Sequence, residues 1–77
     1  MKIYKVSYVV KGHLEGGAIL RQRKPPKVGE EVLIAGKRYK VAEVINLMPP
    51  IDNVVFLHAT LKPLEEVEKE MAGIPGG

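Results

Sequence analysis

The chain has 77 residues, of which 45% are hydrophobic, with a formal net charge of +3 and no cysteine. This length has room for one domain, and the absence of cysteine excludes disulfides and thiolate zinc sites. No apolar run reaches the ~18 residues that a membrane-spanning helix needs, and residues 1–10 lack the apolar block of a signal peptide. We therefore expect a cytoplasmic protein with no membrane partner.

The charge is distributed unevenly along the chain. Residues 1–40 carry ten Lys and Arg but three acids, whereas residues 41–77 carry two Lys and six acids. Such asymmetry can attract a polyanion, or can pair the acidic part of one copy with the basic part of another. Abundant Lys and Glu, frequent Pro and no Cys are also compatible with a thermophilic source.

Residues 2–10 alternate between polar and apolar side chains. Alternate residues, among them Tyr4 and Tyr8, fall on one mainly apolar face, so the pattern predicts a strand with that face buried. Glycines then mark a turn, and residues 18–23 predict a second, weaker strand.

A proline pair separates these strands from a hairpin. Pro25 and Pro26 cannot join a central ladder, so they indicate a loop. Beyond it we expect a short strand over residues 31–35, a tight turn, and a strand over residues 38–46. Since Ala35 resists the positive φ of a type I′ turn, we expect a type I turn with a left-handed bulge glycine.

The alternation of apolar residues shifts by one position within residues 38–46, which predicts a bulge near Ala42 and Glu43. Residues 46–53 are predicted to form a loop with an unusual apolar content. Residues 54–61 are apolar on both faces, which is typical of a central strand.

The spacing of the apolar residues changes after that strand. Leu64, Val67 and Met71 are spaced as one face of a helix, and acids occupy its first turn, where the helix dipole favours them. We expect a helix over residues 64–72, packed on the sheet, and a loose tail over residues 74–77.

The segment Pro26-x-Val-Gly-Glu-x-Val-x-Ile-x-Gly-x-x-Tyr-x-Val41 resembles the turn-and-hairpin pattern of SH3-like small barrels. With the order of the elements, it implies a mainly β fold: a small SH3-like, partly open barrel of about five strands with one C-terminal helix. We expect a single barrel-like domain over residues 1–73. This architecture hosts many unrelated functions, so the resemblance implies a fold and not an activity.

Few side chains suit catalysis or metal binding. His13 and Glu15 could place two ligands on one strand face, but a zinc site needs three or four converging ligands. No nucleophile is grouped with a base, and a domain this small rarely encloses a catalytic pocket. We expect no enzyme and no cofactor, with a metal or enzymatic role at His13, Glu15 and His58 as the last alternative.

Basic residues are one positive signal for binding. Nucleic-acid binders combine Lys and Arg with aromatic rings that stack on bases, and the sequence pI of about 9.3 lies in their range. The rings at Tyr4 and Tyr8, however, share the face expected to be buried. The candidate nucleic-acid-binding residues are Arg21, Arg23, Lys24, Lys27, Lys37, Arg38 and Lys40.

The apolar segment 46–53 is the other signal. Exposed apolar surface on a small domain marks a partner site; alternatively, the segment folds back and plugs the open end of the barrel. Our leading hypothesis is a non-enzymatic interaction module that self-associates as a homo-oligomer or binds another protein, with nucleic-acid binding as the alternative. The candidate interaction residues are Leu47, Met48, Ile51, Leu64, Val67 and Met71.

Overall fold

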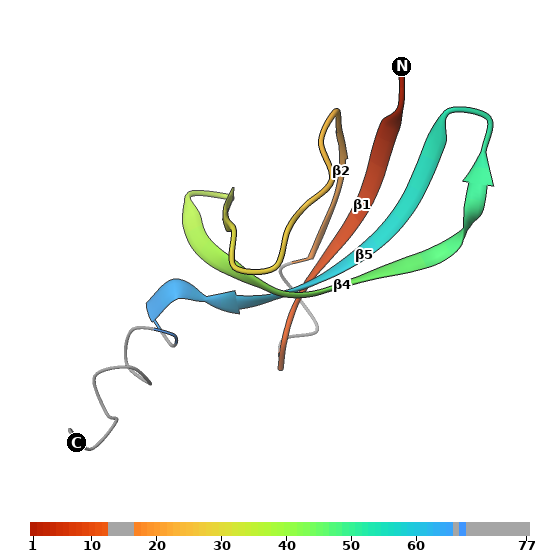
Figure 1. Ribbon diagram of the computed structural model, residues 1–77. Helices are drawn as coiled ribbons and strands as arrows, with labels where there is room; N and C mark the ends of the chain where they lie inside the picture. The colour runs from red at the N-terminus through yellow and green to blue at the C-terminus, as the bar shows by residue number, and fades with distance from the viewer. Residues whose placement is uncertain (13–16, 66, 68–77) are drawn as a thin grey trace.

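The structure is a computed structural model that describes residues 1–12, 17–65 and 67. Its strands are β1 (Ile3–Val10), β2 (Ala18–Gln22), β3 (Glu31–Ile34), β4 (Lys37–Ile51) and β5 (Val54–Pro63). They form one five-stranded sheet in the order β2-β1-β5-β4-β3, which curls into a half-barrel (Figure 1). The predicted mainly β fold of about five strands is confirmed.

Strand β5 lies at the centre of this sheet, as its two apolar faces predicted. On one side it pairs in parallel with β1, from Ile3 opposite Val54 to Val10 opposite Leu61. On the other side it pairs antiparallel with β4. The first and last of the described strands are therefore neighbours.

The inner, concave face of the curl holds the core. The alternation predicted for β1 is confirmed, because every second side chain from Val6 to Val10 is buried. The β2–β3 connection joins the two edge strands and contains the buried Pro26. The buried hydrophobic side chains of the core are Val6, Tyr8, Val10, Tyr39, Val41, Leu57, Ala59 and Leu61.

The turn between β3 and β4 differs from the expected type. Ile34 pairs with Lys37 across a two-residue loop, and both loop residues have positive φ, 51° at Ala35 and 79° at Gly36. That combination belongs to a type I′ turn, whose twist matches the flanking strands. The predicted type I turn is therefore wrong, because the requirement of the hairpin outweighs the strain of alanine in the left-handed region.

Strand β4 is much longer than expected. The predicted bulge is confirmed as a register shift between Val41 and Glu43, but the predicted loop over residues 46–53 is wrong. The strand continues to Ile51, and a turn at Asp52 and Asn53 leads into β5.

The proline pair in β4 is accommodated in two ways. Pro49 and Pro50 fall within a further register shift, between Met48 and Ile51. Strand β3 pairs with β4 only from Lys37 to Lys40, so the prolines lie where no neighbouring described strand requires their missing N–H groups.

The C-terminal helix falls largely outside the described residues. Leu64, Glu65 and Val67 are helical, whereas most of the predicted 64–72 helix and the predicted tail over residues 74–77 are not described. Within the described part of the chain, no helix is long and apolar enough to cross a membrane.

Candidate interaction surface

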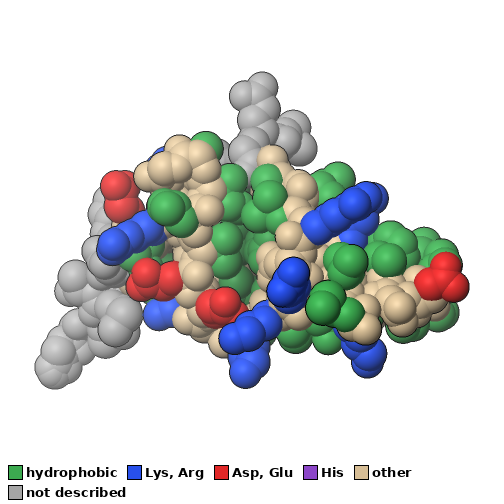
Figure 2. Space-filling model, turned by 90° about the horizontal axis from the view of Figure 1, so that it is seen from above, with side chains coloured by type: hydrophobic (Ala, Val, Ile, Leu, Met, Phe, Trp, Pro, Cys, Tyr) green, Lys and Arg blue, Asp and Glu red, His purple; other side chains and the backbone are tan. Residues whose placement is uncertain are grey.

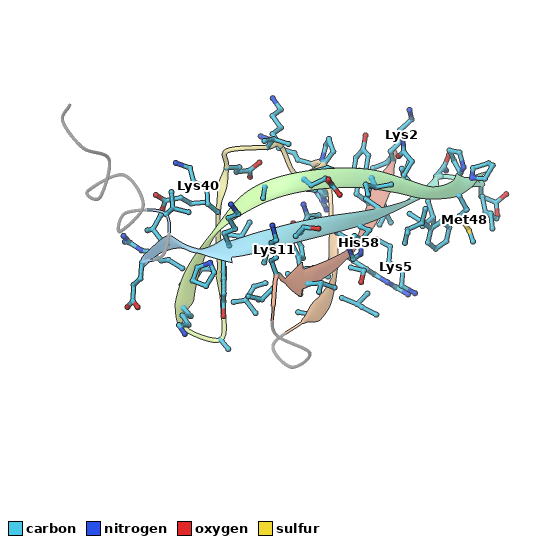
Figure 3. All side chains as sticks on the ribbon, turned by 90° about the horizontal axis from the view of Figure 1, so that it is seen from below. Lys2, Lys5, Lys11, Lys40, Met48 and His58 are labelled. Atoms are coloured by element: carbon cyan, nitrogen blue, oxygen red, sulfur yellow. The ribbon has the colours of Figure 1, made fainter. Side chains whose placement is uncertain are left out.

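The convex side of the sheet, called the outer face here, carries the side chains that alternate with the core. Cross-strand pairing arranges them in rows. One row runs from Arg21 on β2 through Lys5 on β1 and Phe56 on β5 to Met48 on β4. Figure 3 views this side, with Lys5, His58 and Met48 labelled.

The far end of the β4–β5 hairpin, residues 45–56, is called the arm. Its β4 side chains are exposed: 57% at Leu47, 47% at Met48 and 56% at Ile51. The apolar segment of the sequence therefore lies on the surface and does not plug the open end of the half-barrel. The structure shows that these three candidate interaction residues are exposed. That a partner binds them remains a prediction.

A bulge decides which arm side chains share the outer face. Ile45 pairs with His58, and Asn46 pairs with the buried Leu57, so Asn46 is on the inner face. Strict alternation would return Met48 to the inner face as well. The register shift between Asn46 and Met48 instead sets Met48 opposite Phe56 on the outer face.

The other candidate interaction residues lie at the opposite end of β5. Leu64 and Val67 are half-buried, and they line two different pockets beside β4, near Arg38 and Lys40 respectively. Met71 lies outside the described residues. Leu64 and Val67 therefore do not form one surface with the arm in the described structure.

The candidate nucleic-acid-binding residues are divided among three places. Arg21 lies on β2 at one edge of the sheet, whereas Lys37, Arg38 and Lys40 lie on β4 next to the other edge strand. Arg23, Lys24 and Lys27 belong to the connection between β2 and β3. Figure 2 shows Lys and Arg side chains in several separate places on the inner side of the molecule.

Two of these groups differ in their surroundings. Lys40 pairs with Glu31 on one side and with Lys62 on the other, so an acid accompanies the cations there. Arg21 instead pairs with another cation, Lys5. The pair of Arg21 and Lys5 therefore has no acid opposite it, whereas Glu31 offsets part of the positive charge around Lys40.

The outer face around Arg21 is hollowed by two adjoining pockets, each of about 230 Å³. They share Ile3 and Arg21; the first also contacts Lys5, Val54 and Phe56, and the second extends to Arg23. Sequence reasoning missed Lys5 and Phe56. The alternation of residues 2–10 placed Ile3 and Lys5 on one face, but no local signal placed Phe56 beside them.

The tyrosines do not offer stacking surfaces. Tyr8 and Tyr39 are buried, and the half-buried Tyr4 packs against the same core. Phe56, the single phenylalanine of the chain, lies on the outer face and is half-buried. It is therefore the aromatic ring that the outer face presents.

Histidine and carboxylate groups form no metal site among the described residues. His58 lies on the outer face between Ser7 of β1 and Ile45 of β4. His13 and Glu15 lie outside the described residues.

The outer face thus combines an apolar arm with a basic, aromatic hollow. Comparisons with protein-family models, with curated proteins and with solved structures found no match to this chain.

Proposed function

We propose that the protein is a non-enzymatic interaction module that self-associates through the outer face of the arm. The observation that supports this proposal most directly is the exposure of Met48 and Ile51, 47% and 56%, on a hairpin whose β5 strand also pairs with β1. Aliphatic side chains held rigidly in water offer a partner apolar area that is already ordered.

The apolar residues of the arm are contiguous across two strands. Met48 lies opposite Phe56, and Ile51 lies opposite Val54, while Ile3 of β1 extends the same row as Val54. Burial of such area contributes about 25 cal/mol per Å². A continuous group of this kind supports docking better than scattered apolar residues do.

A second copy of the chain is the occupant that we favour. A chain of 77 residues buries only about 60% of its unfolded surface, so added burial has a large effect on its stability. The molecule measures 49 × 25 × 18 Å, and its broad side can accommodate the ~800 Å² that each partner of a standard interface buries. Two-fold pairing of identical faces is the commonest arrangement among oligomers.

Light scattering during size-exclusion chromatography at about 100 µM tests the proposal. We expect a dimer for the natural chain and a monomer for Met48→Asp, because a carboxylate buried in the interface would lose its hydration. Leu33→Asp is the matched control: Leu33 is 67% exposed on β3, outside the arm, and its substitution should leave the dimer intact. A monomer for the natural chain would refute self-association.

The same proposal includes two finer expectations. The β3–β4 hairpin, with its turn at Ala35 and Gly36, supports assigning the half-barrel to the SH3-like small barrels. The absence of cysteine from the sequence supports a reducing, cytoplasmic environment.

A further inference from the structure

We infer that the outer face carries a second binding site, which takes single-stranded nucleic acid. The site is the hollow lined by Ile3, Lys5, Arg21, Arg23, Val54 and Phe56, called the basic groove here. It adds a ligand of a different class, which competes with self-association because Ile3, Val54 and Phe56 belong to both surfaces.

The row that crosses the groove places two cations beside one aromatic ring. Arg21 lies opposite Lys5, and Lys5 lies opposite Phe56. Neighbouring strands are about 4.8 Å apart, so both long cationic side chains can reach a group lying on the ring. Proteins that bind single strands use this combination, with bases stacked on rings and phosphates held by Lys or Arg.

The charge of the groove selects an anion. Three described lining residues, Lys5, Arg21 and Arg23, are cationic, and none of the described lining residues is acidic. When grouped cations of this kind neutralise phosphates, the counterions condensed on the nucleic acid are released, which favours binding at low salt. The cations of β4 are less suitable, since Glu31 lies opposite Lys40 and Glu65 lines the pocket of Lys37 and Arg38.

The shape of the groove favours a polymer with repeating units. Its two pockets have equal volumes of about 230 Å³ and meet at Ile3 and Arg21. A single strand alternates flat bases with phosphates, so consecutive units can occupy both pockets with Arg21 between them. A run of acidic residues satisfies the charge but supplies no flat ring for Phe56, whereas every nucleotide supplies both a phosphate and a base, so we favour nucleic acid.

Fluorescence anisotropy with a labelled mixed-sequence oligonucleotide of about 12 nucleotides tests the inference. The full chain is titrated at about 50 mM and about 200 mM salt. If three cations contact phosphates, the log–log slope is about −2, and affinity falls by about tenfold or more over this range. No binding at low salt would overturn the inference.

Variants separate the groove from the general positive charge. Arg21→Glu should weaken binding by tenfold or more and flatten the salt dependence. Arg38→Glu makes the same charge change at another exposed position and should weaken binding by less than threefold. Equal losses in the two variants would mean that binding follows net charge alone, which overturns the site.

The ring is tested by Phe56→Leu, which keeps an apolar side chain and removes the flat face. We expect about a tenfold loss for one stacked base, with a circular dichroism spectrum like that of the natural chain. Unchanged affinity in a folded variant would overturn stacking. If Phe56→Leu does not fold, stacking can be measured with the natural chain and an oligonucleotide that contains the fluorescent base 2-aminopurine. Stacking on Phe56 should change the fluorescence of this base. Unchanged fluorescence on binding would overturn stacking.

Two further measurements separate the groove from a site for acidic peptides and from the self-association surface. A poly-glutamate peptide that binds as tightly as the oligonucleotide would overturn the preference for nucleic acid. A Met48→Asn chain removes the apolar side chain of the arm without placing a negative charge beside Phe56. As a monomer it should bind the oligonucleotide at least as tightly as the natural chain, since stacking on Phe56 and contacts with Arg21 do not require a second copy. Failure of self-association with retained oligonucleotide binding would refute the proposed function alone.

Discussion

The Tyr8 hydroxyl donates a hydrogen bond of 2.9 Å to Oε1 of Gln22, joining the buried face of β1 to the last residue of β2. Gln22 Nε2 in turn donates to the carbonyl oxygen of Lys24 at 2.7 Å. This chain of hydrogen bonds begins in the core and reaches the start of the β2–β3 connection. These hydrogen bonds hold the β2–β3 connection in place where the connection leaves the sheet.

Tyr8→Phe removes the first of these hydrogen bonds and keeps the ring in the core. We expect the free energy of unfolding to fall by about 1 kcal/mol, the usual contribution of such a bond. Urea denaturation measures the change. Tyr39→Phe is the matched control, because no hydrogen bond of its hydroxyl is present among the described residues, and it should change stability by less than about 0.5 kcal/mol.

Stability should also depend on the ionisation of Tyr8. Burial raises the pKa of Tyr8 above its ordinary value of 10.0 and outweighs the hydrogen bond with Gln22, which lowers the pKa; the carboxylate of Glu30 adds to the rise. The neutral hydroxyl is therefore favoured in the folded state. Its contribution to stability is complete below pH 10 and is lost as the pH rises through the raised pKa of the folded protein.

Denaturation of the natural chain and of Tyr8→Phe across the alkaline range checks this linkage. The free energy of unfolding should fall more steeply for the natural chain above pH 10, the ordinary value of tyrosine. The two proteins should therefore become more similar as the pH rises. Parallel profiles would show that Tyr8 does not contribute to the pH dependence.

The β3–β4 turn can be improved by substitution. Ala35 has a φ of 51°, and left-handed backbone costs an ordinary L-residue about 1 to 2 kcal/mol. Asn tolerates this region, and Asn-Gly is the preferred pair in type I′ turns. Ala35→Asn should therefore raise the free energy of unfolding by about 1 kcal/mol, measured by urea denaturation, whereas Ala35→Val should lower it.

Leu61 is the largest fully buried side chain of the core, so Leu61→Ala tests the packing inside the half-barrel. We expect a loss of about 3 kcal/mol from lost burial and the cavity that remains. Leu33→Ala makes the same chemical change at a side chain that is 67% exposed, and should cost less than about 0.5 kcal/mol. Thermal and urea denaturation distinguish the two, and similar losses would contradict the assigned core.

Much of the strand structure was predictable from local patterns. The alternation of residues 2–10 correctly assigned the buried side of β1, and the slipped phase near Glu43 correctly predicted the bulge in β4. Both are relationships among residues that are close in the chain. They depend on the two-residue period of a strand and not on its neighbours.

The arm was not predictable in the same way. A proline pair such as Pro49 and Pro50 ordinarily interrupts a strand. Strand β4 nevertheless continues to Ile51, because the prolines lie at a register shift and the edge of β4 away from β5 is unpaired there. The turn at Ala35 shows a similar effect, since the hairpin imposes a conformation that alanine alone disfavours. In each case the pairing of strands outweighs a local preference.

The sequence by itself determined that the chain is rich in β-structure and which face of β1 is buried. It also identified apolar and basic residues as candidates for binding. Only the tertiary structure decided that β1 lies beside β5, and therefore that Lys5 and Arg21 lie beside Phe56. Alternation and turn chemistry act between residues that are adjacent in the chain. Pairing between distant strands is selected by burial of their shared core, which no short segment encodes.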